Sequence, residues 1–148
     1  MHISEILTPE RILCNIDTNS KKGALQELSR LLANTSQTLT CTEIFDCLNA
    51  RERLGSTGLG NGIAIPHGRL KHADKPVAAF LKLKSGVDYD ALDQQPVDLL
   101  FALLVPEGST KQHLQILARL AEMFCNDSLL NHLRLESSAH GIYTLLTS

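Results

Sequence analysis

The stretch VDLLFALLV, residues 97–105, decides how the rest of the chain is organised. It is almost continuously apolar, as is typical of a strand covered on both faces of a sheet, whereas a strand with one face in water alternates apolar and polar residues. Its apolar run, residues 99–105, is far shorter than the roughly 20 residues that a membrane-spanning helix requires. We therefore predict a central, fully buried strand here.

Strand-like and helix-like patterns alternate along the rest of the chain. Further strands are expected at residues 11–16, 61–66 and 77–84. Helices are expected at residues 21–34, 40–53, from 109 onwards, 128–134 and 138–146. In the strand at 77–84, Lys82 and Lys84 alternate with apolar residues, which predicts that one face is in water. The order predicts an α/β fold, a mixed β-sheet sandwiched between helices, in a single domain over residues 1–148.

Three of the expected helices begin with residues that commonly cap a helix. Ser20 or Asn19 precedes the helix at 21–34, and the segments TCTE (40–43) and STKQ (109–112) both have the capping-box pattern. The helix that follows STKQ is expected to bury an apolar stripe made of Leu114, Leu117, Ala118, Ala121 and Phe124.

The composition argues against several classes of protein. Hydrophobic residues make up 43% of the 148 residues, which argues against a disordered chain. The net charge of -2 argues against nucleic acid as the main partner, because phosphate backbones require a clustered basic surface. The N-terminus, MHISEILTPERIL, lacks the basic start and apolar core of a secretory signal. The cysteines form no CxxC motif and are expected to be reduced core residues of a cytoplasmic protein: Cys14, Cys41, Cys47 and Cys125.

A second stretch, STGLGNGIAIPHGR (residues 56–69), combines glycines, two hydroxyl residues, a proline and a histidine. It is not a Walker loop, because no Lys-Ser or Lys-Thr pair follows the glycines. It is not a dinucleotide fingerprint either, because the glycines precede a strand and not a helix. Gly58, Gly60 and Gly62 are explained either by positive φ in a turn or by an anion-binding nest of N–H groups.

Three side chains are candidates for chemistry on an anion. His67 ends an apolar run, between Pro66, which fixes the backbone, and Gly68, which leaves room for a partner. His113 lies in the first turns of a helix, where the helix dipole favours an anion. Arg51 lies on the inward face of its helix, where a guanidinium requires a partner. Each also has a structural interpretation: a solvated or core histidine, or an arginine at the helix C-terminus.

Two other kinds of site fit the sequence less well. His67, His72 and His113 lack a cysteine or carboxylate at zinc-ligand spacing. No GxSxG motif provides the nucleophile elbow of a serine hydrolase. We therefore expect no metal centre and no catalytic serine.

The two stretches together resemble a known family. RERLGSTGLGNGIAIPHGR (residues 51–69) and PVDLLFALLVPEGSTKQHL (residues 96–114) are similar to the enzyme IIA domains of the fructose–mannitol class of the bacterial phosphotransferase system. The similarity is closest to the nitrogen-regulatory branch, enzyme IIA-Ntr, and extends over nearly the whole chain. It implies a mixed β-sheet sandwiched between helices and a role in phosphoryl transfer between histidines.

The resemblance also implies roles for individual residues. His67 would accept the phosphoryl group, as a tele-phosphohistidine, from a phosphohistidine carrier protein of the HPr or NPr kind. His113 would lie beside it, Arg51 would lie near the phosphate, and Ser56 and Thr57 would support phosphate binding. No cofactor and no metal is implied.

The destination of the phosphoryl group stays open. In a regulatory protein, phosphorylation would switch contact with a target protein; in sugar uptake of the fructose–mannitol type, the group would pass to an enzyme IIB. A further alternative, from another class, is an interaction module whose histidine is never phosphorylated. The combination of His67, His113 and Arg51 argues against that module. No nucleic-acid partner and no membrane insertion are expected.

Overall fold

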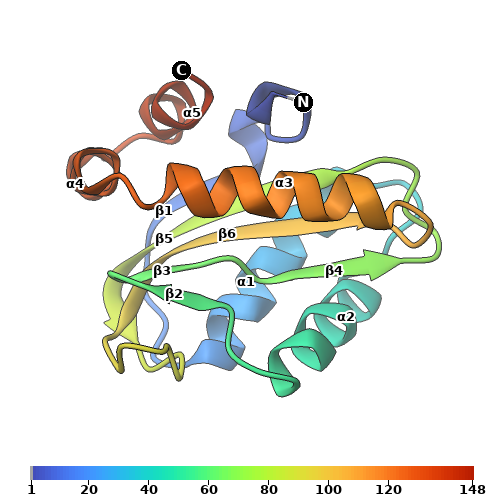
Figure 1. The fold of residues 1–148 in the computed structure, drawn as a ribbon, viewed down its shortest axis with the longest axis horizontal. Coiled ribbons are helices and arrows are strands. Elements are labelled where there is room, and N and C mark those ends of the chain that lie inside the picture. Colours follow the sequence, from blue (N-terminus) through green and yellow to red (C-terminus); the bar gives the residue numbers. More distant parts are fainter. Residues whose placement is uncertain (1) are drawn as a thin grey trace.

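One mixed sheet of six strands carries the fold, and helices cover both of its faces (Figure 1). The computed structural model describes residues 2–148. The strands are β1 (Ile12–Ile16), β2 (Gly58–Gly60), β3 (Ile63–Ala64), β4 (His67–Leu70), β5 (Val77–Val87) and β6 (Val97–Pro106). The helices are α1 (Lys21–Asn34), α2 (Cys41–Arg53), α3 (Thr110–Met123), α4 (Asp127–Leu135) and α5 (Ala139–Thr147), and two short 3-10 helices, Ile3–Glu5 and Pro9–Arg11, precede β1. The predicted fold class is confirmed.

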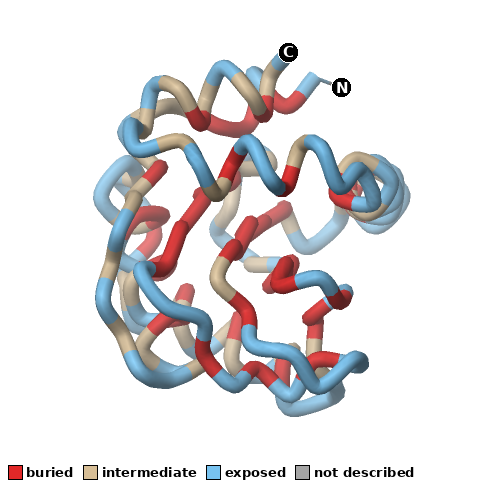
Figure 2. The backbone as a smooth tube through the Cα atoms, turned by 90° about the vertical axis from the view of Figure 1, so that its left-hand side faces the viewer, coloured by how far each residue is buried: buried red, intermediate tan, exposed pale blue. Residues whose placement is uncertain are grey.

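Strand β6 lies at the centre of the sheet, as predicted. It pairs antiparallel with β5 on one side and parallel with β3 and β4 on the other, while β1 lies parallel to β5 and β2 antiparallel to β3. Phe101 and Leu103 belong to a core shared with α3, α4 and α5, whereas Leu100 and Leu104 belong to a core shared with α1 and α2. Buried positions accordingly gather in the sheet in Figure 2, and the outer surfaces of the helices are exposed.

The predicted helix starts are confirmed for two helices and wrong in detail for the third. The Ser20 hydroxyl accepts the N–H of Gly23 at the start of α1, and Thr40 and Glu43 form a capping box at the start of α2. Ser109 precedes α3, but its side chain makes no capping hydrogen bond, so the expected box in STKQ does not form. None of the described helices has the length and apolar composition needed to cross a membrane.

The predicted buried stripe of α3 is wrong for Leu114 and Ala118, which are exposed. The buried positions of this helix are His113, Ile116 and Leu120. The prediction starts the buried stripe at Leu114 and not at His113, because it treats a histidine as a polar surface residue. The helix therefore turns His113 inward and leaves Leu114 63% exposed.

The strand predicted at 77–84 is longer than expected, and its predicted wet face holds for the exposed Lys84 but not for Lys82. Residues 78–83 are all buried, Lys82 included. The Lys82 ammonium donates hydrogen bonds to the carbonyl oxygens of Arg134 (2.5 Å) and Glu136 (2.6 Å), at the end of α4. A buried ammonium is tolerated here because helix-end carbonyls carry partial negative charge and lack intrahelical partners. Cys125 is a further correction, since it is exposed and not a core residue.

Of the strand predicted at 61–66, only the two-residue β3 forms, and two further short strands, β2 and β4, lie just before and just after the predicted range. Gly60 (φ 100°), Asn61 (φ 58°) and Gly62 (φ 81°) turn the chain between β2 and β3. Pro66 has no N–H to donate to a strand ladder, and β4 begins only at the next residue, His67. His67 therefore lies in a strand that pairs with β6, opposite Leu103.

Helix α2 packs closely on β4 at Gly68. A Cβ atom at this position would overlap the Sγ of Cys47 in α2. We expect Gly68→Ala to lower the free energy of unfolding by about 1–3 kcal/mol, the usual cost of overpacking. Denaturant unfolding measures this, and adding Cys47→Ala to the variant should restore part of the loss. An unchanged free energy in the single variant would show that α2 shifts without cost.

Candidate functional site

A surface pocket of about 540 Å³ lies where α2, β4 and α3 meet. Arg51 of α2, His67 and Arg69 of β4, and Thr110 and His113 of α3 are among the residues that line it. These segments meet because β4 runs parallel beside the end of β6 and β6 leads directly into α3 (Figure 1). The pocket thus unites the three residues predicted to act on an anion.

The ring of His67 is held in one tautomer. Its Nδ1 lies 2.8 Å from the carbonyl oxygen of Ile65. Because a carbonyl oxygen only accepts, Nδ1 must carry the ring proton, which leaves the Nε2 lone pair free. Burial, and then the nearby Arg51, lower the pKa of His67, while the hydrogen bond to Ile65 and the charge of Glu52 act in the opposite direction. A neutral imidazole with a free Nε2 is a nucleophile near pH 7.

His113 lies against His67 and is almost completely buried. Their ring centroids are 5.3 Å apart and the rings meet edge-on, at 70°. Among the described residues the Nε2 of His113 has no hydrogen-bond partner. Burial, and then the charges of His67, Arg69 and Arg51, lower the pKa of His113 to about 4. His113 is therefore neutral near pH 7, with one ring nitrogen still able to take a partner.

This low pKa predicts a loss of stability in acid. Between the folded value of about 4 and the ordinary value of 6.5, the unfolded chain binds a proton at His113 that the folded chain does not. The contribution of neutral His113 to the free energy of unfolding is therefore complete above pH 6.5. It is lost as the pH falls towards 4, by about 3 kcal/mol at most. Unfolding free energies of wild type and His113→Gln between pH 7 and pH 4 test this. Parallel curves would contradict the expectation, because the variant should lose less.

Two arginines enter the pocket. Arg51 donates from Nη1 to the carbonyl oxygen of Gly55 (2.8 Å), just beyond the end of α2, so the helix-end interpretation holds for this one nitrogen. Arg69 donates from Nη1 to the hydroxyl of Thr110 (2.8 Å). Arg69 was not among the residues predicted from the sequence to act on an anion. The signal was available, since residues two apart in a strand share a face, which places Arg69 beside His67.

Ser56 and Thr57, expected to support phosphate binding, are not among the residues that line this pocket. The Ser56 hydroxyl donates to the carbonyl oxygen of Tyr89 (2.8 Å), and the Thr57 hydroxyl donates to the carboxylate of Glu52. The glycines also have a structural explanation: Gly60 and Gly62 have positive φ in a turn, whereas Gly58 does not and instead packs closely on Ala91. The turn interpretation of Gly60 and Gly62 is confirmed.

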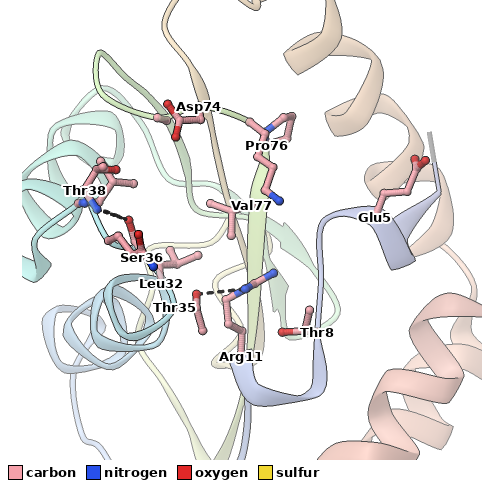
Figure 3. A pocket seen from close by; sticks show the side chains of 14 residues that line it. Glu5, Thr8, Arg11, Leu32, Thr35, Ser36, Thr38, Asp74, Pro76 and Val77 are labelled. Carbon is pink, nitrogen blue, oxygen red and sulfur yellow. Dashed lines mark hydrogen bonds between the residues drawn. The ribbon is translucent and has the colours of Figure 1, made fainter.

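A second hollow, shown in Figure 3, surrounds Arg11. All three guanidinium nitrogens are occupied: Nε donates to the carbonyl oxygen of Ala78 (2.8 Å), Nη2 to that of Ile6 (3.0 Å), and Nη1 to the hydroxyl of Thr35 (3.0 Å). Arg11 therefore ties the N-terminal segment, α1 and β5 together.

The three histidines considered for zinc do not form a site. His72 is exposed and does not line the pocket of His67 and His113. Within residues 2–148, no group of three or more metal-binding side chains comes together. The pocket therefore offers two imidazoles and two guanidinium groups, an arrangement suited to an anion.

Comparison with protein families agrees with this geometry. The family model described as "Phosphoenolpyruvate-dependent sugar phosphotransferase system, EIIA 2" matches residues 5–148. The chain belongs to this family. The resemblance predicted from residues 51–69 and 96–114 is thereby confirmed, and the protein is a component of the phosphotransferase system.

Within the EIIA 2 family, the chain is similar along its whole length to proteins named nitrogen regulatory protein. The relative from Pseudomonas aeruginosa is 44% identical over 146 residues, which are 99% of this chain and 95% of that protein. The crystal structure of nitrogen regulatory protein IIA-Ntr from Neisseria meningitidis superimposes with a TM-score of 0.93 at 43% identity, covering 98% of this chain and 99% of that one. A fructose-specific EIIABC component from Bacillus subtilis is 32% identical over 99% of this chain, which is 23% of that protein.

Proposed function

We propose that the protein accepts a phosphoryl group on Nε2 of His67 from a phosphohistidine carrier protein of the HPr or NPr kind, and that the phosphorylated state regulates a protein target. The observation that carries the proposal is the hydrogen bond that fixes the tautomer of the His67 ring. Its Nδ1 proton is committed to the carbonyl oxygen of Ile65, and the ring lies in a pocket with two arginines. Only Nε2 is left to react.

The transfer itself needs little covalent chemistry from the protein. The lone pair of His67 Nε2 attacks phosphorus, the new P–N bond forms, and the P–N bond of the carrier breaks with its electron pair returning to the carrier's imidazole. Because Nδ1 keeps its proton and its bond to Ile65, the phosphorylated ring is cationic. A cationic ring leaves as a neutral imidazole, so the group passes on readily to the next acceptor.

The pocket provides the charge stabilisation that phosphoryl transfer requires. A bound phosphoryl group brings about -1.5 to -2 charges. A fixed cation about 4 Å away attracts one such charge by on the order of 4 kcal/mol at an effective dielectric constant near 20, before desolvation. Arg51 and Arg69 supply the cations, and neutral His113 supplies an N–H donor from its unpaired Nε2. No metal is needed for this charge balance.

Two exposed leucines flank the pocket and suit it for docking. Leu54, at the end of α2, is 85% exposed, and Leu114, on α3, is 63% exposed. Both line the pocket, so a carrier that brings its phosphohistidine to His67 buries them. The target protein would use the same surface, and carrier and target would compete. A phosphoryl group between the leucines disfavours an apolar or acidic partner by its charge.

The regulatory output is favoured over sugar transport by similarity. Identity is 44% to a nitrogen regulatory protein over nearly its whole length, but 32% to the fructose-specific component. The alternative is that the phosphoryl group passes to an enzyme IIB during fructose–mannitol-type uptake. Action in the cytoplasm is part of the proposal, and the four free cysteines fit a reducing compartment.

The test of the proposal is incubation of the wild-type protein with a phosphorylated carrier, followed by mass spectrometry. We expect a gain of one phosphoryl group, and no gain would overturn the proposal in favour of a non-phosphorylated interaction module. Capture of partners with phosphorylated and unphosphorylated protein then separates the outputs. Loss of uptake of one sugar in a strain lacking the protein, without any phosphorylation-sensitive partner, would favour the transport alternative.

A further inference from the structure

Behind the pocket, α2 carries a buried carboxylate. Glu52 follows Arg51 in the sequence, yet its side chain is only 3% exposed. Of the described carboxylate residues, it alone is buried. Its Oε1 lies 3.0 Å from the Nζ of Lys21, at the start of α1. A buried carboxylate is costly unless it is paired and hydrogen-bonded, so the partners of Glu52 are what allow it to be buried here.

The carboxylate of Glu52 holds the polar segment that precedes β2. Its Oε1 accepts the backbone N–H of Thr57 (3.1 Å), and its Oε2 accepts the Thr57 hydroxyl. The Tyr89 hydroxyl lies 3.4 Å from the Thr57 Oγ1, and it is the donor there because the Thr57 proton is given to the carboxylate. Lys21 in turn lies over the Tyr89 ring, 4.4 Å from its centre. Every polar atom of the cluster is therefore satisfied.

Two hydrogen bonds connect this cluster to His67, one between backbone groups and one from the His67 ring to a backbone carbonyl. The carbonyl oxygen of Thr57 accepts the N–H of Ile65 (3.1 Å). The carbonyl oxygen of Ile65 accepts the Nδ1 proton of His67 (2.8 Å). Ile65, which fixes the tautomer of His67, is thus held by Thr57. Thr57 is in turn held by Glu52.

We propose that Glu52, with Lys21 as its counter-ion, is the positioning residue for His67: it fixes Thr57 and Ile65 so that the His67 proton stays on Nδ1, and its charge strengthens Nε2 as a phosphoryl acceptor. This inference deepens the proposed function and rests on it. It also assigns a role to the hydroxyl of Thr57, which the pocket does not use.

The charges around His67 give the direction of the effect. Arg51 from α2, Arg69 from β4 and the ring of His113 from α3 face the same pocket, and none of them is negative at neutral pH. Glu52 is the acidic group that raises the pKa of His67 against burial and Arg51. Without its charge, Nε2 is a weaker base and the Nδ1 proton is held less firmly.

The experiment compares Glu52→Gln, the double variant Lys21→Met/Glu52→Gln and the wild type by nitrogen NMR of the histidine rings across pH. In metal sites, groups that orient a histidine ligand through hydrogen bonds contribute about 10- to 100-fold to affinity or activity. By analogy, we expect phosphoryl loading from the carrier to slow by about tenfold in the variants that lack the Glu52 carboxylate. In both variants the pKa of His67 should fall, and the tautomer with the proton on Nε2 should appear. Asp46→Asn, which neutralises an exposed carboxylate of α2, is the matched control and should change neither property.

The double variant keeps the test decisive if Glu52→Gln alone fails to fold, because it leaves no unpaired charge. A folded variant with the wild-type pKa and tautomer of His67 would overturn the inference. So would a shifted tautomer with loading at the wild-type rate. If the wild type itself takes no phosphoryl group while the tautomer shifts as expected, the proposed function fails and the positioning role of Glu52 stands.

Discussion

His67→Ala is expected to abolish phosphoryl acceptance and to leave the fold intact. The chemistry belongs to the imidazole Nε2, and neither His113, whose ring is almost completely buried, nor any hydroxyl that lines the pocket replaces it. The fold should persist because β4 pairs with β6 through its backbone at this position. Mass spectrometry after incubation with the phosphorylated carrier measures the loss, and thermal unfolding verifies that the variant is folded.

Two further variants make this result specific. His67→Gln keeps most of the side-chain volume and should be equally inactive. His72→Ala removes an exposed histidine a few residues away and should load normally. Normal loading of either His67 variant would move the acceptor to another residue and remove the basis of the proposed mechanism.

Arg51→Ala is expected to give the second largest loss, about 100-fold in the rate of phosphoryl loading. Removal of one preorganised group that stabilises a developing charge typically costs about 100- to 1000-fold. Arg51→Lys should recover only a small part of this loss, because a lysine retains the charge but loses the planar fork that binds two phosphoryl oxygens. Single-turnover loading rates, at matched folded fractions, measure both variants.

Arg53→Ala is the matched control for Arg51. Arg53 also lies in the last turn of α2, but it is exposed and does not line the pocket. A loading rate for Arg51→Lys equal to that of wild type would show that Arg51 serves only the helix end, through its hydrogen bond to Gly55.

Features that have a local signal in the sequence were predictable from it. The apolar run at 97–105 identifies β6, and the residues around Ser20 and Thr40 identify the starts of α1 and α2. The motif blocks around His67 and His113 identify the family. All of these signals are local, so one stretch of sequence suffices to recognise each.

What the sequence could not provide is the direction of individual side chains. The hydroxyls of Ser56 and Thr57 resemble phosphate ligands in a glycine-rich stretch, but the folded chain turns them towards Tyr89 and Glu52. Lys82 has the pattern of a wet strand face, but the segment after α4 covers it. Both outcomes depend on contacts between residues more than 30 positions apart, or on backbone turns that no period reveals.

The central claim is that Nε2 of His67 receives the phosphoryl group while Nδ1 keeps its proton on Ile65. Phosphorus and nitrogen NMR of wild-type protein, loaded by the carrier and labelled at its histidine nitrogens, tests this most directly. We expect one phosphorus signal coupled to Nε2 of His67, a retained proton on Nδ1, and loss of the label in acid but not in alkali. A phosphorus signal on Nδ1, on another residue, or on an acid-stable hydroxyl would contradict the mechanism.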